Sequence, residues 1–220
     1  MSSYIQKFGR KIINRIKIII FCLCFIVFLI FLSSMTPHSY EIGGIGPAGG
    51  YIFYDCDADN TKEDPDGADN LKSDVCGWKY LEAASADETG SYIWGGNWRS
   101  NTVGTSAAIG TGKANTDKVV ATYGTQEPSK GSADYAALIC KNKYSTYKGK
   151  IYTDWFLPSK YELKVLYNIF IQKKIGNLKS ETYLTSTEAN GAVIAANLYT
   201  DLLVPVRKDS KYHIRAIRAF

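Results

Sequence analysis

Oxygen-bearing side chains recur after residue 54 at spacings that suit a metal ion. Counted from Asp55, they fall at positions 1, 3, 5, 6, 9 and 12 of a calcium loop: Asp55, Asp57, Asp59, Asn60, Glu63 and Asp66. Ca²⁺ takes roughly six to eight oxygen ligands, and its charge offsets the repulsion between clustered carboxylates. Asn60 stands where such loops carry glycine, and Asp66 stands in place of their bidentate glutamate. The sequence predicts a calcium site on Asp55, Asp57, Asp59 and Asp66; the alternative is a solvated acidic loop.

Basic and aromatic side chains suggest a second kind of chemistry, the recognition of sugars. Residues 141–220 contain 14 basic and 6 acidic residues. A basic face attracts sulfated or otherwise anionic glycans, and aromatic rings suit the faces of sugars. The alternative is ordinary lysine usage spread around a surface. The predicted ligand face comprises Trp94, Trp98, Arg99, Tyr199, Arg207, Lys208 and Lys211.

Residues that could carry catalysis are few. The two histidines are His38 and His213, so no His-rich metal site and no Ser-His-Asp set is evident. We expect the DWFLPSKYEL motif to specify a fold, with Glu162 satisfying a helix N-terminus. Arg215 and Arg218 are expected to pair inward with carboxylates. The chain is therefore predicted not to be an enzyme.

The clearest element is a helix that begins after Pro158. Ser159 and Glu162 stand in the capping-box relation S-x-x-E. Apolar residues then recur at helical spacing from Leu163 to Ile171, and Gly176 is expected to take the left-handed position after the last turn.

Shorter elements are predicted on both sides of this helix. Strands are expected at 51–55, 78–84, 183–187, 195–207 and 213–220, and helices at 117–123 and 133–143. Asn115 or Thr116 would cap the first of these helices, Gly124 would end it, and Ser132 would start the second. Helices in the middle with strands at both ends indicate an α+β domain, in which the last strand pairs near the domain's start because both ends must close one core.

The N-terminal segment is basic and then apolar. Residues 1–35 hold five of the 26 basic residues and no acid, and the 21 left equal the 21 acidic residues. Residues 18–32 lack a charged or strongly polar side chain. This pattern predicts a signal or anchor segment (1–35), a linker (36–49) and an exported domain (50–220), with an uncleaved anchor favoured over a cleaved signal peptide. The expected location is the cell membrane or surface, with the domain extracytoplasmic.

Export makes disulfides chemically permissible. Cys56 and Cys76 bracket the acidic stretch, and we predict that they pair. In the chain-entropy model, closing a loop of about 20 residues stabilises by roughly 3 kcal/mol. Cys140 would remain as a buried apolar side chain.

Several motifs occur together in one order: IGGIGPAGGYIFYD, CGWKYLEAA, IGTGKANTDKVV, ADYAALIC, DWFLPSKYELKVLY, Y-x-T-S-T-E and a closing IRAIRAF. Over residues 42–220 the chain resembles the Lcl C-terminal domain family, which is similar to C-type-lectin-like and formylglycine-generating-enzyme-like folds. The resemblance implies one extracytoplasmic α+β domain with long loops over a small antiparallel sheet. The acidic stretch is an insertion relative to shorter members. The oxidase relatives use a late cysteine pair, and no cysteine follows Cys140 here.

The expected function is therefore that of a cell-surface binding module for carbohydrate in adhesion, with an anionic or sulfated glycan among the candidate ligands. The alternative is a structural or protein-interaction domain of the bacterial envelope with no glycan ligand. Expected partners are a glycan or a surface protein, together with the membrane through the N-terminal segment. Nucleic acid is disfavoured by export and by the neutral domain.

Overall fold

The computed structural model describes residues 17, 19–21, 39–57, 77–96, 102–124 and 134–220. Contacts group the chain into one unit of residues 1–39 and a second of residues 40–220. In the first unit, residues 17 and 19–21 are helical. Within the described part of the chain, no helix combines the length and apolarity needed to cross a bilayer. The signal or anchor segment stays a prediction, because most of its residues lie outside the described part.

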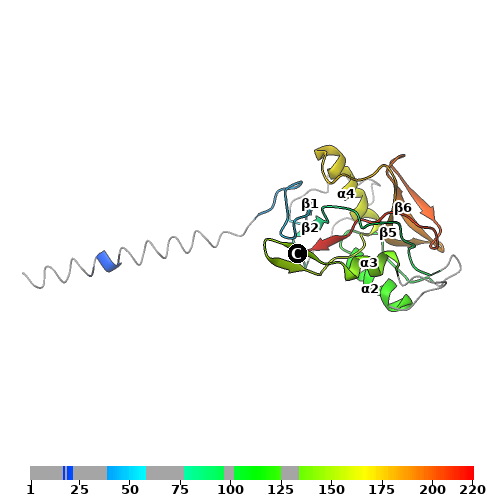
Figure 1. Cartoon of the computed structure of the whole chain (residues 1–220), viewed down its shortest axis with the longest axis horizontal. Helices are drawn as coiled ribbons and strands as arrows, with labels where there is room; N and C mark the ends of the chain where they lie inside the picture. The colour runs from blue at the N-terminus through cyan, green and yellow to red at the C-terminus, as the bar shows by residue number, and fades with distance from the viewer. Residues whose placement is uncertain (1–16, 18, 22–38, 58–76, 97–101, 125–133) are drawn as a thin grey trace, which may run out of the picture. The chain divides into compact units, whose positions relative to one another are not determined.

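The chain's last strand closes a three-stranded antiparallel sheet at the start of the second unit. This sheet has the order β1 (Tyr51–Asp55), β2 (Tyr80–Ala83) and β8 (Ile217–Ala219). Figure 1 shows β8 as the red arrow that runs to the C-terminus. This confirms the prediction that the terminal strand pairs near the start of the domain.

Among its described residues, this unit also contains two further antiparallel sheets and three helices. β3 (Ser145–Tyr147) pairs with β4 (Lys150–Tyr152), and the last sheet has the order β5 (Thr182–Ala189), β6 (Ala192–Asn197) and β7 (Leu202–Val206). The helices are α2 (Gly112–Tyr123), α3 (Ala136–Asn142) and α4 (Lys160–Lys173). α2 packs on α3, and α4 contacts β1, β5 and β6 (Figure 1). The mixture of helices with small antiparallel sheets confirms the α+β class.

Helix α4 begins where the capping box predicts. The Ser159 backbone N–H donates to Glu162 Oε2 (2.7 Å), and the Glu162 N–H donates to Ser159 Oγ (3.4 Å). The end of the helix differs from the prediction. Lys174 takes the left-handed conformation (φ 54°), and its N–H bonds to carbonyls of the last turn. Gly176, also at positive φ, lies in the following turn, where its carbonyl accepts from Arg215.

Helix α2 starts earlier than predicted. Its N-cap is Thr111, whereas Asn115 is already helical and buried. The Asn115 amide bonds the backbone of Ser106 and the hydroxyl of Ser186, so it fastens a loop to the helix instead of capping it. Gly124 ends α2 as predicted. The cap of α3 is Tyr135, and Ser132 lies outside the described residues.

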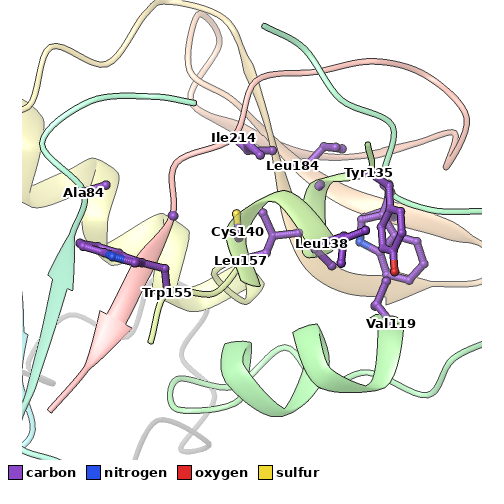
Figure 2. Packing of buried hydrophobic residues seen from close by; sticks show 14 of the residues in the cluster. Ala84, Val119, Tyr135, Leu138, Cys140, Trp155, Leu157, Leu184 and Ile214 are labelled. Atoms are coloured by element: carbon purple, nitrogen blue, oxygen red, sulfur yellow. The ribbon is translucent and has the colours of Figure 1, made fainter. Parts of the chain in front are cut away.

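The core consists of two clusters of buried apolar side chains. Figure 2 shows the first, in which Val119 of α2, Leu138 and Cys140 of α3, Leu184 of β5 and Ile214 gather around α3. Cys140 is fully buried and its thiol is free, which confirms the prediction that it is a buried side chain. Burial raises the pKa of this thiol well above its usual value. The second cluster lies between α4 and the sheet β1-β2-β8.

Candidate functional site

The acidic stretch is described only at its beginning. The Asp57 N–H donates to Asp55 Oδ1 (3.0 Å), and Asp57 Oδ2 forms an ion pair with Lys79 (3.2 Å). Asp59 and Asp66 lie outside the described residues. Among the residues that are described, no three metal-ligating side chains lie together. The calcium site stays a prediction.

Cys56 follows β1 directly. Its sulfur is engaged in a disulfide. Cys76, the predicted partner, lies outside the described residues, so the pairing itself stays a prediction.

Two residues of the predicted ligand face are buried, which corrects their assignment. The Trp94 side chain is 0% exposed, and its indole N–H donates to the carbonyl of Thr185 (2.9 Å). Lys208 is also 0% exposed; its ammonium group lies 4.9 Å from the centre of the Trp94 ring and pairs with Glu188. Neither side chain is accessible to a ligand in this structure, because the two pack against each other in the interior.

The other predicted ligand residues are not gathered on one surface by any described contact. Arg207 is exposed and makes two hydrogen bonds to Asp209 (2.9 and 2.7 Å), which lower the pKa of that carboxyl. Tyr199 is 81% exposed just after β6, and Lys211 is exposed. The last two residues of the set, Trp98 and Arg99, lie outside the described residues.

Arg215 and Arg218 are structural, as predicted. Arg215 pairs with Asp87 (2.7 Å), and Arg218 pairs with both Glu82 (3.0 Å) and Asp154 (2.8 Å). Burial raises the pKa of the Asp154 carboxyl, but the hydrogen bond and charge of Arg218 outweigh it, so the pKa is lowered. Both arginines lie in or just before β8 and are almost fully buried.

Exposed aromatic and basic side chains instead meet on the β3–β4 hairpin, to which the sequence analysis assigned no role. Thr146 lies opposite Ile151 and Tyr147 opposite Lys150. The two connecting residues, Lys148 and Gly149, both have positive φ (48° and 77°). A two-residue type I′ turn requires positive φ at both positions, and its twist matches that of the flanking strands.

One face of this hairpin packs on the domain. Side chains alternate along a strand, so Ser145 and Tyr147 of β3 share a face with Lys150 and Tyr152 of β4. The Ser145 hydroxyl donates to the carbonyl of Ala48 (3.5 Å), and the guanidinium of Arg218 lies 4.9 Å from the centre of the Tyr152 ring. The hairpin is therefore fixed to the unit through this inner face.

The opposite face is accessible. Tyr144, directly before β3, is 72% exposed, Ile151 is 64% exposed, and Thr146 between them is exposed as well. Beside this face, Lys148 lies in the turn and Lys150 follows it on the side of Tyr147; both are exposed, and neither forms an ion pair with a described carboxylate. We use the name outer face of the hairpin for Tyr144, Thr146 and Ile151 together with the two exposed lysines at the turn that border them.

The sequence does contain a signal for this surface. Residues 141–153 hold four lysines, three tyrosines and no acid. Two of the lysines are neutralised by residues distant in sequence, because Lys141 pairs with Asp117 (2.6 Å) and Lys143 with Glu88 (2.5 Å). Local composition alone does not distinguish these two from the lysines that remain available.

A polar pocket of about 350 Å³ lies between the loop 85–90 and the turn 176–179. Its lining contains no aliphatic side chain larger than alanine and no aromatic ring: Ser85, Ala86, Asp87, Glu88, Thr89, Gly90, Gly176, Asn177, Lys179 and Arg215. None of these loop residues was predicted from the sequence to have a functional role. Some of the contacts that create the pocket join residues more than 90 positions apart, such as Tyr183 with Asp87.

No protein-family model matches this sequence, and a search of curated proteins likewise finds no match.

Proposed function

We propose that this chain is a surface-anchored binding module that recognises an anionic glycan through the outer face of the β3–β4 hairpin. The observation that carries the proposal is the combination of an exposed tyrosine ring, an exposed aliphatic side chain and two exposed lysines on one hairpin that packs on the domain through its inner face. This surface replaces the predicted ligand face, of which Trp94 and Lys208 are buried.

The chemistry of the outer face suits a charged sugar better than a purely apolar partner. A tyrosine presents an apolar ring face with a polar end, and it loses little conformational entropy on binding. Lysine ammonium groups attract sulfate or carboxylate groups, an attraction that weakens as salt screens it. Lys148 and Lys150 also lie 5.3 and 5.1 Å from the ring centres of Tyr147 and Tyr152, which restrains their positions.

The membrane anchor and the finer fold assignment belong to the same proposal. Five cations ahead of the apolar residues 18–32 support export with the N-terminus retained in the membrane. The pairing of β8 with β2 beside β1, with long loops between the strands, supports a C-type-lectin-like domain related to the Lcl C-terminal family. Fractionation of cells tests the anchor: full-length protein free in the cytosol would contradict it.

Glycan binding is tested with the purified full-length chain on an array of sulfated, carboxylated and neutral glycans at low and high salt. We expect anionic glycans to bind and binding to weaken as salt rises. Tyr144→Ala and the double variant Lys148→Glu/Lys150→Glu should each reduce binding by about tenfold or more, equivalent to ~1.4 kcal/mol.

Tyr199→Ala is the matched control, because Tyr199 is an exposed tyrosine from the face predicted by sequence. Loss of binding in Tyr199→Ala but not in Tyr144→Ala would move the site away from the hairpin. Absence of binding to every anionic glycan at low salt would leave the structural or protein-interaction role as the better hypothesis.

A further inference from the structure

We propose that the pocket between loop 85–90 and turn 176–179 is a second binding site, separate from the hairpin, for a small sugar acid. The ligand class is a polyhydroxylated compound that carries one carboxylate. The proposal rests on the hydrogen bonds that hold the pocket's walls, on its polar lining and on the one lining cation, Lys179, that forms no ion pair with a described carboxylate.

The pocket's floor is held by a buried network. Arg215 is 1% exposed; its Nε donates to Asp87 Oδ1 (2.7 Å), its Nη1 to the Ala84 carbonyl (3.0 Å) and its Nη2 to the Gly176 carbonyl (2.8 Å). The two walls of the pocket are therefore fastened to one guanidinium. A site whose groups are already in place avoids the entropy cost of ordering them on binding.

A second chain of hydrogen bonds positions Lys179. Its backbone N–H donates to the hydroxyl oxygen of Tyr183 (2.9 Å), and that hydroxyl donates to Asp87 Oδ2 (2.7 Å). Burial, reinforced by the bond to Asp87, raises the pKa of Tyr183 above its usual value, so the phenol stays a hydrogen-bond donor at neutral pH. The backbone of Lys179 is thus fixed relative to the floor, while its side chain is exposed.

The lining excludes an apolar ligand. Ligand pockets are ordinarily lined by hydrophobic and aromatic side chains with a few polar groups. Here the lining is hydroxyl, amide, carboxylate and ammonium groups with glycine and alanine. A ligand must therefore make hydrogen bonds over much of its surface, which hydroxyl groups on a small carbon skeleton do.

The charged side chains of the pocket lining favour a ligand with one anionic group. Asp87 is neutralised by Arg215, and Glu88 by Lys143, whose ammonium group also lies 5.7 Å from the Trp155 ring. Lys179 forms no ion pair with any carboxylate of the described residues. The pocket therefore has one available cation, which suits one carboxylate on the ligand.

Binding is tested by ligand-observed NMR on the full-length chain with three probes. D-glucuronate carries both hydroxyls and a carboxylate, D-glucose lacks the carboxylate, and acetate lacks the hydroxyls. We expect glucuronate to bind at least about tenfold more tightly than either of the others. Equal binding of glucose or acetate, or no binding of glucuronate, would overturn the proposal. The methyl glycoside of glucuronate, tested alongside, distinguishes a glycan chain end, which it resembles, from a free sugar acid.

Variants locate the site. Lys179→Glu should weaken glucuronate binding by about tenfold or more, and Ala86→Trp should abolish it by filling the pocket. Lys148→Glu is the matched control on the hairpin, and it should leave glucuronate binding unchanged. The reverse pattern, with loss in Lys148→Glu and none in Lys179→Glu, would place sugar-acid binding on the hairpin. Array binding of polymeric glycans should respond in the opposite way, so each proposal can fail without the other.

Discussion

Glu162 shows at the scale of one residue how a fold can hold a carboxylate without a cation. It is fully buried and accepts hydrogen bonds from the backbone N–H groups of Gly110 (2.8 Å), Gly112 (3.4 Å) and Ser159 (2.7 Å). Burial raises its pKa to about 7, since the three hydrogen bonds offset only part of the cost of removing the charge from water. Its role is to join the start of α2 to the start of α4.

This pKa predicts a specific pH dependence. The folded pKa lies above the ordinary value of 4.5, so the folded state binds the proton more tightly. Glu162 therefore contributes to the free energy of unfolding in full below pH 4.5, and this contribution is lost as pH rises to about 7. The free energy of unfolding changes by about 3 kcal/mol over this range. Glu162→Gln should be less stable at low pH, because one hydrogen bond is lost, but it should lack this slope. Urea unfolding of both proteins from pH 4 to 8 checks this; a stability difference that is constant with pH would contradict it.

Lys208 supplies a second prediction at the residue scale. Lys208→Ala leaves Glu188 buried without its cation, so the free energy of unfolding should fall by about 3–5 kcal/mol. Lys211→Ala is the control: this lysine is exposed, and the change should stay within about 0.5 kcal/mol. A small effect for Lys208→Ala would return this residue to the list of candidate ligand contacts.

Some residue roles were predictable because their signals are local or demand a partner of one kind. The capping box of Ser159 and Glu162 spans one helical turn, and an arginine in a closing apolar strand needs a buried carboxylate. The roles of Trp94 and Lys208 were not predictable, because Glu188 and Thr185 reach them only through tertiary packing. Their residue types suit a glycan surface equally well, and burial decides between the two.

At the scale of elements, the β3–β4 hairpin escapes sequence analysis because its strands have three residues each. A segment this short shows no clear alternation, and its turn is Lys148-Gly149 where Asn-Gly would have been a strong hairpin signal. The hairpin is held instead by its inner face, through contacts of Ser145 and Tyr152 with distant residues.

A substitution of Lys148 in the β3–β4 turn can separate an effect on the stability of the domain from an effect on glycan binding. Lys148→Asn places a residue that tolerates positive φ at this position and removes one cation. We expect equal or higher stability, by up to about 1 kcal/mol, together with weaker binding of anionic glycans. Thermal unfolding and array binding measured on one preparation check both effects. Unchanged glycan binding would show that the cation at the turn contributes nothing to recognition.

At the scale of the whole domain, residues near its two ends depend on one another. Glu82 of β2 accepts from the N–H groups of Ala48 (3.0 Å) and Gly50 (2.8 Å), and its charge is balanced by Arg218 of β8. Ile217 is fully buried, and its N–H and carbonyl both bond to Phe156. The terminal strand thus links the entry of the domain, the sheet and the segment before α4.

Removal of residues 217–220 should therefore abolish cooperative folding. The deletion leaves Glu82 buried without a cation, at about 3–5 kcal/mol, and removes Ile217 from the core, at about 2–5 kcal/mol. The sum is comparable to the whole stability of a typical domain, about 5–15 kcal/mol. Loss of the near-ultraviolet circular dichroism signal and of a sigmoidal urea transition is the expected result. Deleting Phe220 alone, which keeps Ile217 and Arg218, is the control and should leave the transition cooperative. A truncated chain with an unchanged transition would mean that the domain closes without β8.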